Sequence, residues 1–137
     1  CFMEVPLGVI VHVYIKNLPE YAPSTKFTPP IGPFGFHLHE KGCCDIDNLE
    51  KPFTCAGGHF NPNNQPHGNH AGDFPSLFSN DGVCIMSFFT NRFKVKDIIK
   101  CAIIIHENPD DFKSQPSGNA GRRIACGIVK PLLNPRA

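Results

Sequence analysis

The segment between Glu40 and Phe74 limits most strongly how this chain can fold. It spans about 33 residues without a pattern typical of a helix or a strand, which is uncommon in a compact domain unless the segment is functional or held in place. Its run GGHFNPNNQPHGNHAGD contains four potential metal ligands, spaced by eight, three and three residues: His59, His67, His70 and Asp73. Three imidazoles and one carboxylate suffice for tetrahedral zinc, and metal bonds would supply the order that a hydrophobic core does not. We therefore expect a metal site within this segment.

Strand patterns dominate the rest of the chain. Valine or isoleucine at positions 9, 11, 13 and 15 alternates with other residues, which is the period of two expected of a half-buried strand. Fourteen prolines, twelve glycines and no tryptophan indicate many turns and few long helices. Several short strands without intervening helical patterns predict an antiparallel sandwich or barrel. The expected strands cover residues 2–5, 9–16, 34–40, 74–79, 82–89, 101–106 and 123–130.

Length and charge limit the chain further. Its 137 residues are typical of a single domain, which we expect to span residues 1–137. The net charge is +1 without a run of like charges, so neither nucleic acid nor an anionic membrane surface is an expected partner. No apolar stretch approaches the roughly 20 residues of a membrane helix, and the N-terminus lacks the basic region of a signal peptide. We expect a soluble protein, and we leave its compartment open because a chain that begins at Cys1 can have lost a leader.

The stretch GFHLHE, residues 35–40, places His37 and His39 two positions apart. On a strand such side chains emerge on the same face, so the two imidazoles would converge on one point and could bind a transition metal. An isolated H-x-H is more often a pair of solvated histidines on the polar face of a strand. The histidine-rich segment that follows favours the metal site over that alternative.

Five blocks of the sequence resemble, in order and at suitable separations, the copper,zinc superoxide dismutase family: GFHLHE, AGGHFNP, HGNHAGD, IIIHENPDD and GNAGRRIACGIV. The resemblance covers residues 9–129 and is specific, since it involves five separated blocks rather than one short motif. It implies an all-β fold, a flattened Greek-key β-barrel or sandwich of seven to eight antiparallel strands, with a binuclear metal site held by two long loops. Its loop and disulfide features are similar to those of bacterial-type members.

The resemblance implies copper and zinc as cofactors, with one histidine shared between them. The implied copper ligands are His37, His39, His59 and His106. The implied zinc ligands are His59, His67, His70 and Asp73. His59 would then be the imidazolate that bridges the two metals. His12 is the one histidine left over, and we expect it to face outward from its strand without binding a metal.

The activity implied by the resemblance is the conversion of superoxide to dioxygen and hydrogen peroxide. Four imidazole ligands suit copper in both oxidation states, so copper would be the redox centre, whereas zinc would be structural and electrostatic. His59 would donate a proton to the departing peroxide. The alternative is a copper- and zinc-binding protein on the same fold without turnover. A cation that docks the substrate distinguishes the two, because a metal buffer does not need one.

Two further roles follow from the resemblance, and each has an adjacent alternative. Arg123 matches the arginine that docks the anionic substrate near copper, and a guanidinium stays charged at any working pH. Its neighbour Arg122 could exchange roles with it. Asp110 matches the carboxylate that links a copper-ligand histidine to a zinc-ligand histidine, and such partners fix the orientation of the rings. Asp111 is the alternative for this second role.

Seven cysteines, an odd number, leave at least one unpaired within the chain. The resemblance implies a disulfide between the long loop and the last strand, in which Cys126 is the strand partner. The loop partner is either Cys44 or Cys55, and we choose Cys44–Cys126. Such a bridge would stabilise the fold by roughly 4 kcal/mol in the chain-entropy model. Cys84 and Cys101 lie within apolar strand patterns, and we expect both to be buried.

Three features depart from the family pattern. The chain starts about one strand late, so a strand is missing or a sheet edge is open, and an open edge favours pairing into a homodimer. The Pro-rich residues 19–33 are longer than the family uses before its H-x-H strand, and we expect a surface flap or a contact with a partner. Residues 107–121 are short and lack the usual steering charges, so attraction of superoxide would depend on Arg123, Lys113 and Arg122.

Overall fold

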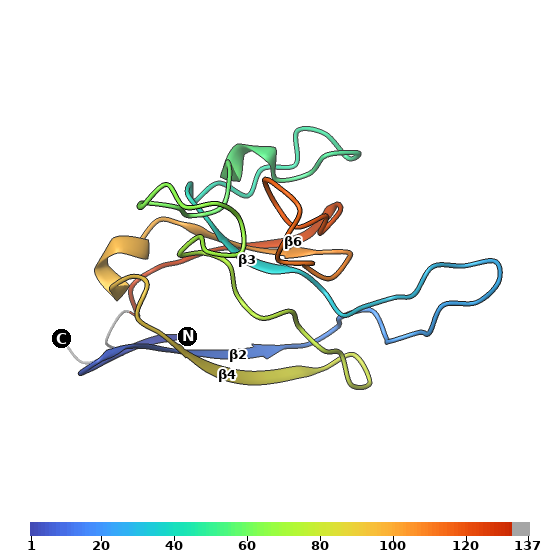
Figure 1. Ribbon diagram of the computed structural model, residues 1–137, viewed down its shortest axis with the longest axis horizontal. Helices are drawn as coiled ribbons and strands as arrows, with labels where there is room; N and C mark the ends of the chain where they lie inside the picture. The colour runs from blue at the N-terminus through green and yellow to red at the C-terminus, as the bar shows by residue number, and fades with distance from the viewer. Residues whose placement is uncertain (133–137) are drawn as a thin grey trace.

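The computed structural model describes residues 1–132, which form two antiparallel sheets of three strands each (Figure 1). The first sheet has the strand order β1-β2-β4, and these strands are Phe2–Val5, Gly8–Ile15 and Cys84–Thr90. The second has the order β3-β5-β6, with strands Phe36–His39, Ala102–His106 and Arg123–Ile128. The same part of the chain has two short 3-10 turns, η1 at Thr54–Ala56 and η2 at Val95–Ile98. None of its helical segments is long and apolar enough to cross a membrane.

The alternating residues near the N-terminus form β2, the central strand of the first sheet. Its valines at positions 9, 11 and 13 are buried, whereas His12 and Tyr14 are exposed, because successive side chains point to opposite faces of a sheet. His12 thus faces outward as predicted. Its Nδ1 lies 2.7 Å from the Oγ of Ser87, its cross-strand partner in β4.

The hydrophobic core lies between the two sheets, which face each other in Figure 1. Phe74 connects the sheets: its ring centroid is 5.5 Å from that of Phe36 in β3 and 5.1 Å from that of Phe88 in β4. Phe74 is 1% exposed, and burial of such a side chain contributes about 1.5–3 kcal/mol. Because Phe74 directly follows the histidine-rich segment, this packing anchors one end of that segment to both sheets.

The all-β class was predicted correctly, but the number of strands was not. Residues 1–132 contain six strands rather than seven to eight, and their two sheets do not close into a barrel. Residues 74–79, expected to be a strand, pair with a described neighbour only where Leu77 meets Phe34. Pro75 lacks a backbone donor, which interrupts regular pairing. β1 lies at one edge of its sheet, and the homodimer expected from an open edge stays a prediction.

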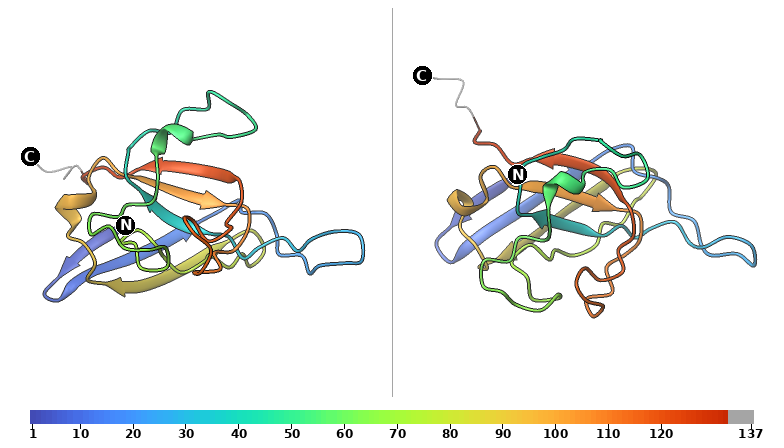
Figure 2. Two further views of the ribbon diagram at one scale, coloured as in Figure 1. Left: turned by 45° about the horizontal axis from the view of Figure 1, so that its top comes forward. Right: turned by 90° about the horizontal axis from the view of Figure 1, so that it is seen from above.

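The Pro-rich residues 19–33 form a hairpin that projects away from the sheets (Figure 2). Near its tip, the backbone N–H of Thr25 donates to the carbonyl of Thr28 at 2.9 Å. Phe27 in this turn is 89% exposed. The hairpin is a surface flap, one of the two roles expected for it, and a contact with a partner stays a prediction.

Two long loops lie against the β3-β5-β6 sheet: the first loop, residues 41–73, and the second loop, residues 107–122 (Figure 2). Within residues 1–132, two disulfides anchor the first loop. One joins Cys44 to Cys126 of β6, the pairing chosen from the sequence, over a separation of 82 residues. The other joins Cys43 to Cys55 of η1 over 12 residues, and the sequence analysis did not foresee it. The two thiols expected to be buried are buried and unpaired: Cys84 and Cys101.

We expect the two disulfides to stabilise the metal-free fold unequally. Loss of a disulfide gives the unfolded chain more conformational entropy. The resulting loss of stability grows with the number of residues between the two cysteines. Replacing Cys44 and Cys126 by serine should lower the free energy of unfolding by about 4.5 kcal/mol, against about 3 kcal/mol for Cys43 and Cys55. Urea unfolding of the metal-free proteins measures both losses. An equal or larger loss for the shorter bridge would contradict the chain-entropy argument.

Candidate metal centre

Strand β3 carries its two histidines on the face that points away from the core. Phe36 and Leu38 pack between the sheets, so the alternation of side chains directs His37 and His39 to the opposite face. The two loops cover that face, and neither histidine is more than 1% exposed. The solvated pair that an isolated H-x-H usually forms is therefore excluded.

Four histidines gather on this face and form what we call the first cluster: His37 and His39 of β3, His59 of the first loop, and His106 at the end of β5. One ring nitrogen of each lies within 4.8 Å of those of the others. Each ring also has one buried nitrogen without a hydrogen-bond partner among the described residues, namely His37 Nδ1, His39 Nε2, His59 Nε2 and His106 Nε2. A buried polar group left unpaired costs about 1–3 kcal/mol. Four of them in one cluster indicate a ligand, and imidazole nitrogen is a donor that copper binds well.

The second nitrogen of two of these rings is used in a backbone hydrogen bond. His39 Nδ1 donates to the carbonyl of Gly57 at 2.9 Å, and His106 Nδ1 donates to that of Gly121 at 3.2 Å. Burial lowers the pKa of His39 to about 2 and the pKa of His106 to about 3. In the metal-free protein both rings are therefore neutral, and the lone pair of each Nε2 is available to a metal.

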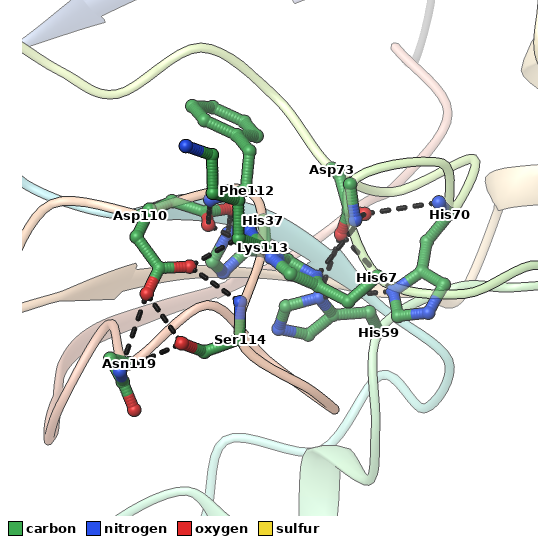
Figure 3. A network of polar contacts seen from close by, with 12 residues as sticks. His37, His59, His67, His70, Asp73, Asp110, Phe112, Lys113, Ser114 and Asn119 are labelled. Carbon is green, nitrogen blue, oxygen red and sulfur yellow. Dashed lines mark hydrogen bonds and ion pairs between the residues drawn. The ribbon is translucent and has the colours of Figure 1, made fainter.

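The first loop alone supplies the second cluster, which consists of His59, His67, His70 and Asp73. Figure 3 shows the three imidazoles gathered beside the Asp73 carboxylate. The Nδ1 atoms of His59 and His70 lie 2.8 Å and 3.2 Å from its Oδ1, and the Nδ1 of His67 lies 3.3 Å from its Oδ2. Tetrahedral zinc, with bonds of about 2.0–2.1 Å, holds its ligand atoms about 3.3 Å apart. The four donors thus have the spacing and the chemistry of a zinc site.

The Asp73 carboxylate also organises the turn that carries these ligands. Burial acts to raise the pKa of Asp73, but the hydrogen bond with His59 and the nearby histidines outweigh it and lower this pKa to about 2. Oδ2 accepts hydrogen bonds from the backbone N–H groups of Gly68, at 2.8 Å, and His70, at 3.0 Å. The ionised carboxylate therefore shapes the backbone of residues 68–73 as well as offering a metal ligand.

Backbone hydrogen bonds hold the first loop beside β3. The N–H of Phe60 donates to the carbonyl of Leu38 at 2.7 Å, and the N–H of Leu38 donates to the carbonyl of Gly72 at 2.9 Å. A side chain at Gly72 would clash with the Leu38 carbonyl, so the close approach of the loop backbone to β3 requires glycine at this position. The neighbours of these residues in sequence, His59 and Asp73, are thereby placed next to the histidines of β3.

His59 belongs to both clusters. Its Nδ1 lies 2.8 Å from Asp73 in the second cluster, whereas its Nε2 is one of the unpaired nitrogens of the first. Its ring centroid is 4.0 Å from that of His37. One imidazole thus presents a nitrogen to each of two metal positions, as a bridging ligand must.

The family model for copper/zinc superoxide dismutase (SODC) matches residues 9–129. The chain belongs to the copper/zinc superoxide dismutase family. Superoxide dismutase [Cu-Zn] 1 of Aquifex aeolicus is 38% identical to it over 138 residues, covering 90% of this chain and 73% of the relative. Superoxide dismutase [Cu-Zn] of Legionella pneumophila is 34% identical over 137 residues, covering 94% of this chain and 75% of the relative.

Solved structures of the copper/zinc superoxide dismutase family show the same fold. The enzyme from Brucella abortus superposes with a TM-score of 0.72 at 28% identity, covering 94% of this chain and 85% of the other. A superoxide dismutase-like protein from Bacillus subtilis superposes with a TM-score of 0.72 at 32% identity, covering 93% and 85%. The fold of the chain thus agrees with membership of this family.

Asp110 lies between the two clusters, whereas its neighbour Asp111 does not. Its Oδ2 is 2.7 Å from Nε2 of His37, and its Oδ1 is 2.8 Å from Nε2 of His67. Burial acts to raise the pKa of Asp110, but the hydrogen bonds with these two rings outweigh it, so the pKa is lowered. Asp111 is exposed and instead accepts hydrogen bonds within the second loop, including one from the Ser114 hydroxyl at 2.6 Å.

Arg123, at the start of β6, is held beside the first cluster. Its Nη1 donates to the carbonyl of Phe53 at 2.5 Å, and its Nη2 donates to that of Gly57 at 2.6 Å. The Gly57 carbonyl also accepts the hydrogen bond from His39, so one oxygen links the guanidinium to a histidine of the cluster. Arg122 is exposed and pairs with a glutamate of the second loop instead.

The two carbonyls that hold Arg123 were not found from the sequence. Phe53 and Gly57 flank η1, and both have a positive φ, of 60° and 75°. A carbonyl has the same chemistry in every residue, so no residue type marks it as a partner. The glycine pair of AGGH was the one available signal, because glycine tolerates a backbone conformation that other residues avoid.

We expect Asp110→Ala to weaken metal binding at both clusters. The substitution frees the Nε2 atoms of His37 and His67, and loss of such a partner typically weakens metal binding about 10- to 100-fold. Asp111→Asn, which keeps an oxygen acceptor for the second loop, is the matched control and should bind as the wild type does. Competition with a chromophoric chelator measures the affinity for each metal. Wild-type affinity of Asp110→Ala for both metals would exclude this role.

Proposed function

We propose that this protein is a superoxide dismutase, which converts two superoxide ions and two protons into dioxygen and hydrogen peroxide. The observation that carries the proposal is the first cluster, where four buried imidazoles each have one nitrogen without a hydrogen-bond partner among residues 1–132. A cation, Arg123, is held beside that cluster, as a site for an anionic substrate requires. Membership of the copper/zinc superoxide dismutase family supports the same activity.

The two clusters would hold two different metals. The donors for copper are His37, His39, His59 and His106. The donors for zinc are His59, His67, His70 and Asp73. Bound copper would supply one-electron chemistry by alternating between Cu(II) and Cu(I), while zinc would supply a fixed positive charge.

His59 is the residue that we assign to proton transfer. Its Nδ1 is committed to the second cluster, so a proton can be taken up and released only at Nε2, on the side of the first cluster. Its side chain is 3% exposed, and backbone hydrogen bonds of its neighbour Phe60 hold the loop against β3. A proton on Nε2 is therefore delivered within the site to a product that leaves beside it.

Arg123 is the residue that we assign to substrate docking. The guanidinium stays protonated at working pH, and its other N–H groups have no hydrogen-bond partner among residues 1–132, so they can bind an anion. The net charge of the chain is only +1, so a long-range field contributes little to the capture of superoxide. A local cation fixed beside the first cluster is the stronger means of attraction here.

Superoxide dismutase activity should track bound copper. Metal-free protein should be inactive, protein loaded with zinc alone should stay inactive, and addition of one equivalent of copper should restore activity, because only copper has two accessible oxidation states. Activity and metal content are measured on the same sample. Stoichiometric copper and zinc without activity would instead identify a metal-binding protein without turnover.

Arg123→Ala should lower kcat/KM for superoxide by roughly 10- to 100-fold, since local charges of this kind raise association rates by such factors. Metal content should not change, because Arg123 is not among the donors of either cluster. Arg122→Ala, which removes the same charge one residue away, is the control and should lose far less activity. Equal losses in the two variants would assign the effect to overall charge rather than to docking at the site.

A further inference from the structure

The side chain of Gln115, in the second loop, reaches across to the main chain of a zinc-site residue in the first loop. Its Oε1 accepts a hydrogen bond from the N–H of His67 at 2.8 Å, and its Nε2 donates to the carbonyl of His67 at 3.2 Å. Nε2 also lies 3.3 Å from the carbonyl of Lys113, within its own loop. The side-chain amide thus bonds to the N–H and the carbonyl of His67, as the backbone of a neighbouring β-strand would.

These two bonds hold the polar main-chain groups of His67, and the N–H of the next residue, Gly68, donates to Asp73 Oδ2 at 2.8 Å. Among residues 1–132, the N–H and the carbonyl of His67 make no other hydrogen bond. The ring of His67 is held separately, by Asp110 Oδ1 at 2.8 Å from Nε2. The second loop therefore controls the ring and the backbone of His67 through two different side chains.

The contact between the loops leaves little freedom around this point. A side chain at Gly68, which follows His67, would lie 2.6 Å from the carbonyl of Phe112 in the second loop. A side chain at Gly118 would reach His67 Nε2 and Asp110. Figure 2 shows the two loops side by side. The second loop thus supports one wall of the second cluster.

We propose that Gln115 is a positioning residue for zinc, which fixes the backbone of His67 so that its Nδ1 faces the other donors of the second cluster. The inference rests on the zinc site of the proposed function and adds a residue that is no ligand. His67 Nδ1 lies 3.3 Å from Asp73 and makes no hydrogen bond within residues 1–132, so it is free to bind a metal. Its direction is set by the main chain that Gln115 holds and by the ring contact with Asp110.

Glutamine is suited to this position because both an acceptor and a donor are needed. Glutamate of the same length offers the acceptor but places a second acceptor against the His67 carbonyl. Methionine has a similar length and makes neither bond. Gln115 is an exposed residue, so these substitutions open no cavity in the core, and the fold is retained.

The test measures zinc affinity of copper-free protein by competition with a chromophoric chelator. Gln115→Met should bind zinc about tenfold more weakly than the wild type, as is typical when a partner that orients a ligand is lost, and Gln115→Glu should fall between the two. Cobalt(II) bound in place of zinc should show shifted visible absorption bands in Gln115→Met, which a general loss of stability would not produce.

Gln65→Met is the matched control, because Gln65 lies in the first loop and its side-chain amide bonds only to the nearby Asn63 carbonyl among the described residues, at 3.0 Å. It should bind zinc and cobalt as the wild type does. Unchanged zinc affinity in Gln115→Met would overturn the role of Gln115, and so would an equal loss of zinc affinity in Gln65→Met. Neither result would contradict the proposed metal centre. A wild-type protein that bound no zinc would overturn the proposed metal centre, and this inference with it.

Discussion

The carboxylate of Asp110 is the contact on which the arrangement of the whole site depends. One oxygen meets His37 on β3 and the other meets His67 in the first loop, while Asp110 itself belongs to the second loop. Three segments far apart in the sequence are thereby joined at one buried group. In each ring the other nitrogen, Nδ1, faces a cluster and has no hydrogen-bond partner in the described part of the chain. The same interaction therefore holds the loops together and prepares two rings for metal binding.

Strand β3 connects this site to the stability of the fold. In four residues, Phe36 and Leu38 enter the core while His37 and His39 enter the first cluster, because a strand alternates its faces. A change in the register or tilt of β3 would move both sets together. The core thus fixes the positions of two donors before any metal arrives. The first loop is ordered separately, by the contacts of Gly72 and Asp73, by the disulfides and by the second loop.

The sequence could predict which residue types gather, but only in part how they are held. Histidine spacing marked the H-x-H pair and the donors of the first loop, because few other reasons bring so many imidazoles into one short segment, whereas His106 was assigned from the family resemblance. Spacing within the family pattern favoured Asp110 over its neighbour Asp111, and the direction of the Asp110 side chain, toward His37 and His67, agrees with that choice. The sequence pattern predicted a strand at residues 74–79, where Pro75 prevents continuous pairing. It revealed neither the Cys43–Cys55 bridge nor the contacts of Gln115 with His67. Those contacts depend on the path of the loops, which no local pattern encodes.

The adjacent cysteines explain how an arginine can be fixed by an irregular segment. Cys44 is bonded to β6, the strand that begins with Arg123, and Cys43 is bonded to Cys55 inside η1. The two carbonyls that hold the guanidinium flank η1, so covalent bonds anchor both the cation and its acceptors. None of these bonds involves a donor of either cluster. The disulfides therefore help to set the direction of the guanidinium, and the shared Gly57 carbonyl links it to His39 of the first cluster.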